Sequence, residues 1–485
     1  MKAAFHTLGC KTNSYETQAI IEQFEKAGFE IVPFTEAADV YIINTCSVTA
    51  VAAQKSRQML HRCRKFSPSA LVVACGCYAQ EAAEKLTEDG SVDLVIGNNE
   101  KSKVLDLVLN STEQTRGEER ICEEIPTDCR LSGDVSENDT SSCNLVIKEH
   151  NADRILIDDL TRCRDYESQR ITNAGSHVRA YVKIQDGCDR FCSYCIIPFL
   201  RGRSRSRNME EILQEVQDLA DAGMKEIVLT GIDISDFCCV NSDNTAPKIK
   251  GNALAELILS IEKIKTIERI RLGSLEAGII TKDFLDQIRE SKKLCPHFHL
   301  SLQSGSDTTL KRMNRDYSTS DFLESLSKIR SVFQEPAITT DVIVGFPQET
   351  ETEFEETIQF VQKAGFSQLH VFPYSRRKGT RADKMQGQLS KAQKAERARF
   401  LIKEGEKLQR SYMERFFGKP VQVLIEEVVY EEGREWLVGF TPEYVRSAVR
   451  VSEENYPETI INKIVTIYPK KIQIIENELF LTNDV

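Results

Sequence analysis

The sequence lacks the apolar segments that carry proteins into or across membranes. No run approaches the roughly 20 apolar residues that a membrane-spanning helix needs. The first residues, MKAAFHTLGCKTN, lack the apolar core of a secretory signal. We therefore expect a soluble, cytoplasmic protein.

An excess of positive charge is also missing. The 63 Lys and Arg residues face 74 Asp and Glu residues, which gives a formal net charge of −11. A surface that is basic all over is thereby excluded, so any contact with nucleic acid must use local patches of Lys and Arg.

Cysteine, by contrast, is plentiful. Fifteen Cys is a high number for a cytoplasmic chain, and the odd count excludes complete disulfide pairing. In a reducing compartment, closely spaced Cys more often bind metal or take part in catalysis than form disulfides. The cysteines are therefore the first candidates for chemistry.

At 485 residues, the chain is long enough for about three domains. Residues 1–109 alternate short Val/Ile-rich runs with helix-length amphipathic stretches, which predicts an α/β domain with an open parallel sheet. Residues 110–175 are polar and acidic, so we expect a linker or insertion. Its cysteines lack metal-ligand spacing and are interpreted as incidental thiols: Cys122, Cys129, Cys143 and Cys163.

Two further domains are expected after this linker. Residues 176–412 contain six strand-like runs separated by helical stretches, a pattern that predicts a partial (β/α)6 barrel with its functional groups at the C-terminal strand ends. Residues 413–485 contain short Val/Ile-rich runs with turns between them, which predicts a small antiparallel β-barrel.

The strongest motif is CDRFCSYC, which follows the first strand of the predicted barrel. It places Cys188, Cys192 and Cys195 at C-x3-C-x2-C spacing. Three thiolates can hold three irons of a 4Fe-4S cluster and leave the fourth iron open for a small molecule. The alternatives are a zinc site with a fourth ligand elsewhere and an electron-transfer cluster.

A second set of cysteines is spread along the first domain. Cys10, Cys46 and Cys77 each follow a predicted strand, and the ends of neighbouring parallel strands can converge on one side of a sheet. Buried Cys is common in apolar cores, so structural thiols are an equally good interpretation of the pattern alone. Cys75 is a rival to Cys77, because alternate strand residues point to the same face.

These motifs resemble those of known enzymes. CDRFCSYC resembles the radical S-adenosylmethionine (SAM) superfamily, whose cluster binds SAM at its open iron. GCKTN, NTCSVT and GCYAQ, together with GCDRFCSYCIIPFLRGRSRSR, resemble the radical SAM methylthiotransferases. The resemblance implies two 4Fe-4S clusters, the one that binds SAM on Cys188, Cys192 and Cys195 and an auxiliary one on Cys10, Cys46 and Cys77. GCxAQ, the family's pattern, favours Cys77 over Cys75.

The family resemblance also extends to the fold and the cavity. It implies an N-terminal methylthiotransferase domain, a radical SAM core and a C-terminal TRAM-like, RNA-binding β-barrel. It further implies that three segments line the cavity for SAM and substrate: Leu229–Ile234, His299–Gly305 and Asp341–Pro347. No individual contact within them follows from the sequence, and no further catalytic residue is assigned.

The implied reaction adds a methylthio group to an unactivated C–H bond, with SAM, an electron donor and a sulfur source as partners. The motifs look most like the branch that acts on threonylcarbamoyladenosine at position 37 of tRNA, next to the anticodon. Isopentenyladenosine in tRNA and an aspartate of a ribosomal protein are the alternative substrates. An iron-sulfur RNA-binding protein without catalysis is the alternative outside enzymes.

Two basic segments are candidates for tRNA contact. RGRSRSR follows the cysteine motif, and YSRRKGTRA follows the last predicted barrel strand, so both fall near the functional end of the barrel. A solvated basic face or structural ion pairs explain the first segment equally well. The candidate residues are Arg201, Arg203, Arg205, Arg207, Arg376, Arg377, Lys378 and Arg381.

Overall fold

A computed structural model describes residues 1–112, 154–160, 163, 165–173, 175, 177–238, 251–451 and 460–483. Most of the predicted linker, with Cys122, Cys129 and Cys143, lies outside these ranges. The chain forms two compact units. Unit 1 comprises Met1–Arg170 with Phe199–Gly202, and unit 2 comprises Ile171–Pro198 with Arg203–Val485.

Unit 1 is a parallel α/β fold, as the sequence predicts. Its described strands form one six-stranded sheet with the order β2-β1-β3-β4-β5-β6, and all pairs are parallel. The strands are β1 (Lys2–Thr7), β2 (Glu30–Val32), β3 (Val40–Thr45), β4 (Leu71–Gly76), β5 (Leu94–Ile96) and β6 (Ile155–Leu156). Its helices include α1 (Lys11–Lys26), α2 (Ala50–Phe66) and α3 (Cys77–Glu88).

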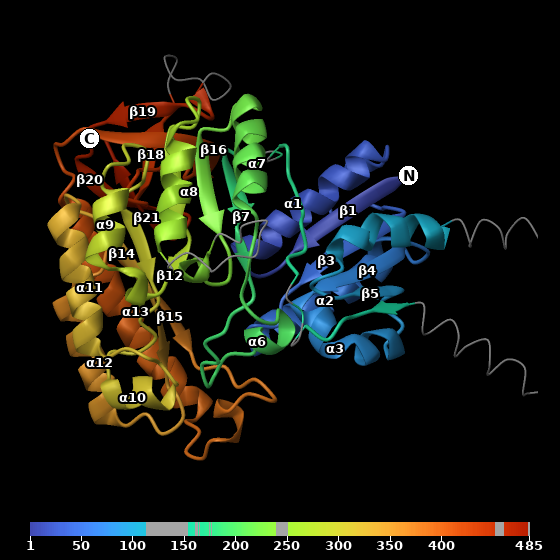
Figure 1. Ribbon diagram of the computed structural model, residues 1–485, viewed down its shortest axis with the longest axis horizontal. Coiled ribbons are helices and arrows are strands. Elements are labelled where there is room, and N and C mark those ends of the chain that lie inside the picture. The colour runs from blue at the N-terminus through green and yellow to red at the C-terminus, as the bar shows by residue number, and fades with distance from the viewer. Residues whose placement is uncertain are drawn as a thin grey trace, which may run out of the picture. The chain divides into compact units, whose positions relative to one another are not determined.

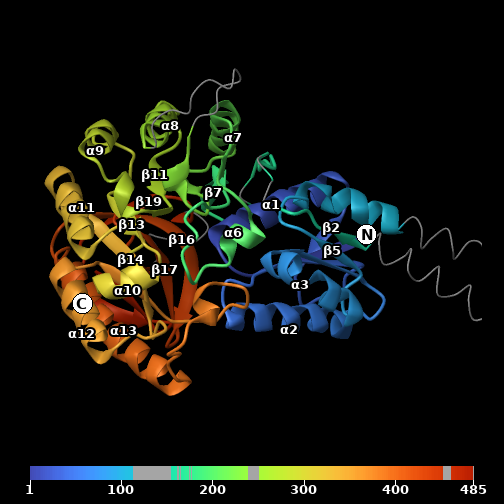
Figure 2. The ribbon, with the colours of Figure 1, turned by 60° about the horizontal axis from the view of Figure 1, so that its bottom comes forward.

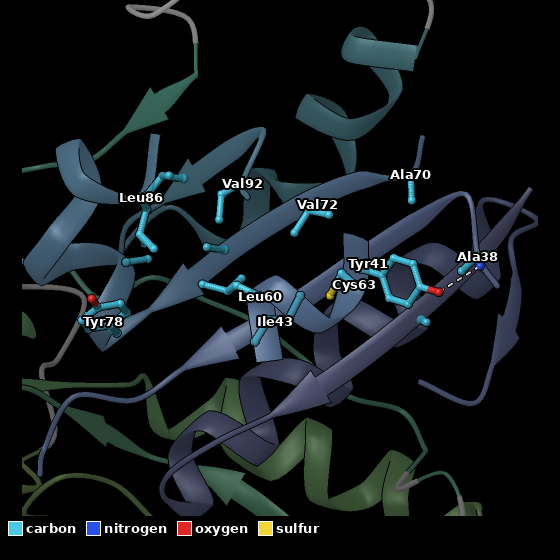
Figure 3. Close-up of a cluster of buried hydrophobic side chains, with 14 of the residues drawn as sticks. Ala38, Tyr41, Ile43, Leu60, Cys63, Ala70, Val72, Tyr78, Leu86 and Val92 are labelled. Carbon is cyan, nitrogen blue, oxygen red and sulfur yellow. Dashed lines mark hydrogen bonds between the residues drawn. The ribbon is translucent and has the colours of Figure 1, made fainter. Parts of the chain in front are cut away.

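Both faces of this sheet are covered, which explains its continuous apolar strands. On one face, Ile43 and Val72 pack against Leu60 of α2 and Leu86 of α3 (Figure 3). On the other face, the next residues along the strands pack against α1, through side chains such as Phe24. A parallel sheet buried on both faces selects Val and Ile at consecutive positions rather than at alternate ones.

Unit 2 contains the predicted partial barrel. Six parallel strand segments follow one another in sequence, with β11 and β12 acting as two parts of the third. A parallel bridge between Ile270 and Leu294 links the two halves of the sheet. The strands are β7 (Arg179–Lys183), β10 (Glu226–Thr230), β11 (Arg269–Leu272), β12 (Ser274–Leu275), β13 (His297–Leu300), β14 (Ala337–Val344) and β15 (Gln368–Pro373).

Helices lie in an arc outside these strands (Figure 2). Local sequence signals fix where several of them begin. Ser318, Thr350 and Ser390 each cap a helix and form a reciprocal capping box with the residue three positions later. The helices are α7 (Met209–Asp221), α8 (Asn252–Glu262), α9 (Lys282–Ile288), α11 (Thr319–Val332), α12 (Glu351–Ala364) and α13 (Lys391–Glu414).

The C-terminal residues form a mostly antiparallel sheet with the order β19-β16-β17-β18-β21-β20 (Figure 1). Its strands are β16 (Val421–Glu431), β17 (Arg434–Phe440), β18 (Arg446–Arg450), β19 (Ile464–Ile467), β20 (Lys471–Ile475) and β21 (Glu478–Thr482). One pair among these strands departs from the predicted antiparallel barrel, because β18 and β21 run parallel. The last hairpin places its second strand beside β18 in a direction that the sequence pattern does not reveal.

Buried arginines join this sheet to the barrel within unit 2. Arg269 donates to the carbonyl oxygens of Phe440 and Gln422 at 2.9 and 3.0 Å. Arg271 donates to the carbonyl oxygens of Pro442 and Thr441 at 2.9 and 3.1 Å. Both guanidinium groups also pair with Glu226. The β17–β18 turn is therefore bound to the N-terminal ends of the barrel strands.

No helix in the described ranges is both long enough and apolar enough to cross a membrane.

Candidate functional site

Cys188, Cys192 and Cys195 lie in a single loop after β7 and the short strand β8 (Gln185–Asp186). The loop turns sharply: the Cys195 N–H donates to the Cys192 carbonyl oxygen at 3.0 Å, and Phe191 adopts a left-handed φ of 49°. Such a conformation is unfavourable for a residue with a side chain and persists only where its surroundings enforce it. Here the Arg203 guanidinium lies 4.5 Å from the centre of the Phe191 ring.

Neighbouring loops hold the cysteine loop in place. Ser193 donates its N–H to the Met313 carbonyl and its hydroxyl to the Arg312 carbonyl, both at 2.9 Å. The Ala382 N–H donates to the Ser193 carbonyl at 2.7 Å. Tyr194 packs against a small buried apolar cluster that includes Met313. The loop is thus fixed from two sides of the barrel rather than by its own sequence.

The environment of the three thiols combines burial with charge. Burial raises the pKa of the Cys188 thiol, and Asp233 and the other two cysteines raise it further. Arg315 donates an N–H to the Cys192 Sγ at 3.2 Å. A charged donor favours the thiolate form that binds iron. The three sulfurs are close enough to influence one another electrostatically.

A charged cavity adjoins this loop. Arg190 donates to Asp233 at 2.8 Å, and Arg315 forms an ion pair with Glu276. The cavity has a volume of about 330 Å³ and is lined by Asp189, Arg190, Cys192, Asp236, Asn314, Arg315 and Asp316. Its lining combines guanidinium and carboxylate groups, which suit a ligand that carries both charges, such as an amino-acid group.

The sequence analysis did not single out these polar residues. Asp233 falls within the expected lining segment Leu229–Ile234, after β10, whereas Glu276 and Arg315 fall outside all three expected segments. The sequence feature that could have indicated Arg315 is the polar run KRMNRDYS, which follows the SLQSG segment. His299–Gly305 begins within β13, and Asp341–Pro347 covers the last residues of β14 and the loop beyond it. Their contacts with a ligand remain predictions.

The second cysteine set lies at the carboxyl ends of three neighbouring strands in unit 1. Cys10 follows β1 and caps α1, Cys46 follows β3, and Cys77 follows β4 as the first residue of α3. Since β1, β3 and β4 are adjacent in the sheet, the strand ends are within one or two strand spacings, each about 4.8 Å. Residues 67 positions apart in sequence are thereby brought to the same edge.

Contacts confirm that these strand ends meet. A Cβ atom added to Gly9 would lie 2.9 Å from the Cys46 Sγ, so the chain before Cys10 runs directly against Cys46. Burial raises the pKa of Cys46 to about 11, and Cys77 and Cys10 add to that effect. Asn98 donates its side-chain N–H toward the Cys77 Sγ at 3.6 Å. Cys10 and Cys77 lie at the N-termini of α1 and α3, where partial positive charge favours a bound anion, and Cys46 lies directly against the segment before Cys10.

Cys75 faces away from this edge. It belongs to the buried apolar cluster under α1, and its thiol points to the Ile43 carbonyl oxygen at 3.7 Å. Burial raises the pKa of Cys75 to about 12. Gly76, with a φ of +92°, ends the strand alternation between the two cysteines, so Cys75 and Cys77 do not share a face. The geometry supports Cys77 as the member of the set.

The spacing of the thiols bears on which metal group they could hold. In the described ranges, no three Cys, His, Asp or Glu side chains are gathered closely enough to hold a single metal ion. A tetrahedral zinc ion would draw its sulfurs to within about 4 Å of one another, since each Zn–S bond is about 2.3 Å. A four-iron cluster separates its ligands more widely. Three cysteines in one loop of unit 2 and three at neighbouring strand ends of unit 1 are each a thiol set of the number that a 4Fe-4S cluster with one open iron requires.

The segment RGRSRSR is divided between surface and interior. Arg201 is fully buried in unit 1, where it pairs with Glu16 at 2.9 Å and donates to Asn13 at 2.6 Å. Arg207 is buried in unit 2 and pairs with Glu215, and Arg205 is buried near Asp186. For these three, the structure favours structural ion pairs over RNA contact. Arg203 remains accessible, with 38% of its side chain exposed.

The segment YSRRKGTRA lies against the cysteine loop, through the hydrogen bond from Ala382 to Ser193. Arg376, Lys378 and Arg381 are exposed, whereas Arg377 is buried. Exposed Arg376 also pairs with Asp383. Three cations of this segment are therefore accessible at the cysteine-loop end of the barrel.

Comparisons with known proteins agree with this geometry. Residues 182–361 match the Radical SAM superfamily, and residues 2–97 match the Uncharacterized protein family UPF0004. The chain is 36% identical over 482 residues to the threonylcarbamoyladenosine tRNA methylthiotransferase MtaB of Bacillus subtilis, which covers 98% of this chain and 97% of that protein. The chain belongs to the radical SAM methylthiotransferase family.

Other relatives lie in a neighbouring branch. The tRNA-2-methylthio-N(6)-dimethylallyladenosine synthase of Thermotoga petrophila is 33% identical over 457 residues, covering 90% of this chain and 93% of that protein. Among solved structures, the radical SAM methyltransferase TsrM of Kitasatospora setae aligns with a TM-score of 0.49 at 14% identity, covering 77% of this chain and 74% of that one. As a radical SAM methylthiotransferase, the protein is an enzyme whose family membership implies a 4Fe-4S cluster and SAM.

Proposed function

We propose that this enzyme converts N6-threonylcarbamoyladenosine at position 37 of tRNA to its 2-methylthio derivative. The observation that carries the proposal is the near-complete alignment with the B. subtilis protein of that name, at 36% identity. The relatives named for dimethylallyladenosine are 33% identical over slightly shorter alignments. The cysteine geometry of the two units supports the same chemistry.

The loop in unit 2 is proposed to bind the 4Fe-4S cluster that cleaves SAM, through Cys188, Cys192 and Cys195. When bound, this cluster supplies the reducing electron for radical formation, which side-chain acids and bases cannot provide for an unactivated C–H bond. The chain's own residues hold the ligand. Arg190 and Arg315, which line the adjoining cavity, are proposed to bind an anionic group, and Asp236 and Asp316 a cationic one.

The strand ends of unit 1 are proposed to bind the auxiliary 4Fe-4S cluster, through Cys10, Cys46 and Cys77. Its role in the reaction is to carry the sulfur that is inserted. Cys10 and Cys77 lie at the N-termini of α1 and α3, where partial positive charge favours a bound anion, and the Asn98 side chain donates toward the Cys77 Sγ. The external sulfur source and the electron donor are further partners in this proposal.

Exposed cations near the cysteine loop are proposed to bind the tRNA backbone: Arg203, Arg376, Lys378 and Arg381. Their position after β15 and after the cysteine motif supports contact with a phosphate backbone at the functional end of the barrel. The C-terminal sheet is proposed to be the TRAM-like RNA-binding domain.

Mass spectrometry of nucleosides from total tRNA tests the proposal. Cells without the gene should lose the 2-methylthio derivative and retain threonylcarbamoyladenosine itself. Loss of the methylthio derivative of isopentenyladenosine instead would assign the enzyme to the other tRNA branch. An unchanged tRNA profile, with SAM-derived label entering a ribosomal protein, would exclude a tRNA substrate.

A further inference from the structure

A second cavity of unit 2 lies far from the cysteine loop. It has a volume of about 420 Å³ and forms between the start of β15, the second half of α13 and the C-terminal sheet. Polar groups predominate in its lining: Gln368, His370, Glu406, Gln409, Arg410, Arg446, Asn477 and Glu478, the last of which pairs with Arg446. Phe440 and Tyr444 supply aromatic surface, and Ile474 and Leu479 supply aliphatic surface.

The aromatic wall of this cavity is rigid. The Phe440 and Tyr444 rings stack with centroids 4.6 Å apart and planes 18° apart, and His297 stacks on Tyr444, also with centroids at 4.6 Å. Arg179 lies 4.5 Å from the Phe440 ring centre, and Arg271 lies 4.9 Å from that of Tyr444. Since Arg271 is also bonded to the β17–β18 turn, the wall is held in place before any ligand arrives.

Polar groups of the same lining have the chemistry that recognises a nucleobase. Gln409 and Gln368 can each donate and accept along a base edge, and the Arg410 guanidinium can contact a phosphate or lie against a base. Proteins read unpaired RNA by stacking bases on aromatic or guanidinium planes and by bonding their edges. The two aliphatic side chains, Ile474 and Leu479, provide little apolar surface for the anchoring side chain of a bound peptide. The volume admits one small-molecule-sized group rather than a helix.

The cavity and the cysteine loop lie at opposite ends of β15. Gln368 begins the strand, while Tyr374, just beyond its last residue, packs with Tyr194 of the cysteine loop. Six strand residues span about 17 Å at about 3.3 Å per residue. A nucleotide in the second cavity is therefore not the one being modified at the cysteine loop.

We propose that this cavity binds one unpaired nucleotide of the substrate RNA, different from the modified adenosine, and so fixes the position of the RNA loop. The proposal rests on the proposed function, because it takes tRNA as the substrate. It assigns Gln409 and Arg410 of α13 as residues that determine RNA specificity, and the Phe440 ring, held by its stack on Tyr444, as the surface against which the nucleotide lies.

Binding of anticodon stem-loop RNAs to the holoenzyme, followed by fluorescence anisotropy, tests this site. The RNAs carry an abasic residue at each loop position in turn. The variant Gln409→Ala/Arg410→Ala should bind the intact RNA about tenfold more weakly than the wild type. At one loop position other than 37, the wild type and the variant should bind the abasic RNA equally. Without the base, Gln409 and Arg410 of the wild type have nothing to contact, so their removal has no further effect.

Arg399→Ala is the matched control, since Arg399 is an exposed arginine of the same helix outside the cavity. It should bind all RNAs as the wild type does, and the midpoint of thermal unfolding should confirm that every variant is folded. Equal affinity of the double variant and the wild type for the intact RNA would overturn the proposal. Equal weakening for every abasic RNA would also overturn it, because that result indicates phosphate contact alone. A wild type that neither binds nor modifies tRNA would instead refute the proposed function itself.

Discussion

The two cysteine sets of this enzyme are built in contrasting ways. In unit 2, three cysteines lie within eight consecutive residues, and surrounding loops fix the loop that carries them. In unit 1, three cysteines spread over 68 positions meet because three adjacent parallel strands end at one edge. The first set depends on a local motif and its anchors, whereas the second depends on the register of a whole sheet. Substitutions should therefore affect the two sets differently.

The largest expected effect separates the two sets by activity. Replacing Cys188, Cys192 and Cys195 together with Ala should reduce reductive cleavage of SAM to background, measured as 5′-deoxyadenosine. Replacing Cys10, Cys46 and Cys77 should preserve that cleavage and abolish the methylthio product, because the cysteine loop is untouched. Cys63→Ala, a buried thiol of α2 outside both sets, is the control. Full methylthiolation by the second triple variant would refute the auxiliary assignment.

The next effect concerns the free energy of unfolding that the buried ion pairs of Glu16 contribute to unit 1. Glu16 is fully buried between Lys101 and Arg201. Glu16→Gln should cost about 3–5 kcal/mol in free energy of unfolding, because it leaves two buried cations without their carboxylate. Asp189→Asn removes the exposed pair with Arg203 beside the cysteine loop and should cost less than about 1 kcal/mol. Urea unfolding measures the free energy of unfolding of both variants. Equal losses would contradict the claim that the buried Glu16 ion pairs stabilise the fold more than the exposed pair of Asp189 and Arg203.

A smaller effect tests whether strand-end geometry positions Cys77. In Gly76→Ala, the new Cβ would lie 2.5 Å from the Thr45 carbonyl oxygen, at a φ of +92°. The strained backbone should cost about 1–3 kcal/mol and displace Cys77 from the other thiols. The reconstituted protein should therefore lose the iron of the auxiliary cluster and keep the iron of the cluster in unit 2. Gly90→Ala has a positive φ but open space around it and should keep its full iron content.

The smallest effect decides between the neighbouring cysteines. Cys75→Ala removes a buried thiol from the apolar core and should cost about 1 kcal/mol, with both clusters retained. Cys77→Ala should lose the iron of the auxiliary cluster and the methylthio product. If Cys75→Ala lost that iron instead, the face assignment within β4 and α3 would be incorrect.

Much of the fold was predictable because its signals are local. The six strands of the barrel and four of the strands in unit 1 were evident as Val/Ile-rich runs. The short strand β2 escaped because three residues carry no distinguishable pattern. The parallel pairing of β18 with β21 escaped because strand direction depends on how distant segments pack. In RGRSRSR, four similar arginines alternate in sequence, yet their acidic partners come from separate elements, so only the structure distinguishes Arg201 from Arg203.

The sequence by itself determined the cysteine motif, the order of strands and helices, and the family, since each is written in neighbouring residues. The family pattern favoured Cys77 over Cys75, and the tertiary structure supplied the physical reason, because Cys75 lies in the apolar cluster under α1. Only the tertiary structure decided that three arginines of one basic segment are buried in ion pairs, and that the C-terminal sheet and the barrel enclose a second cavity. These outcomes depend on which residues from distant positions meet, and sheet register and burial settle that.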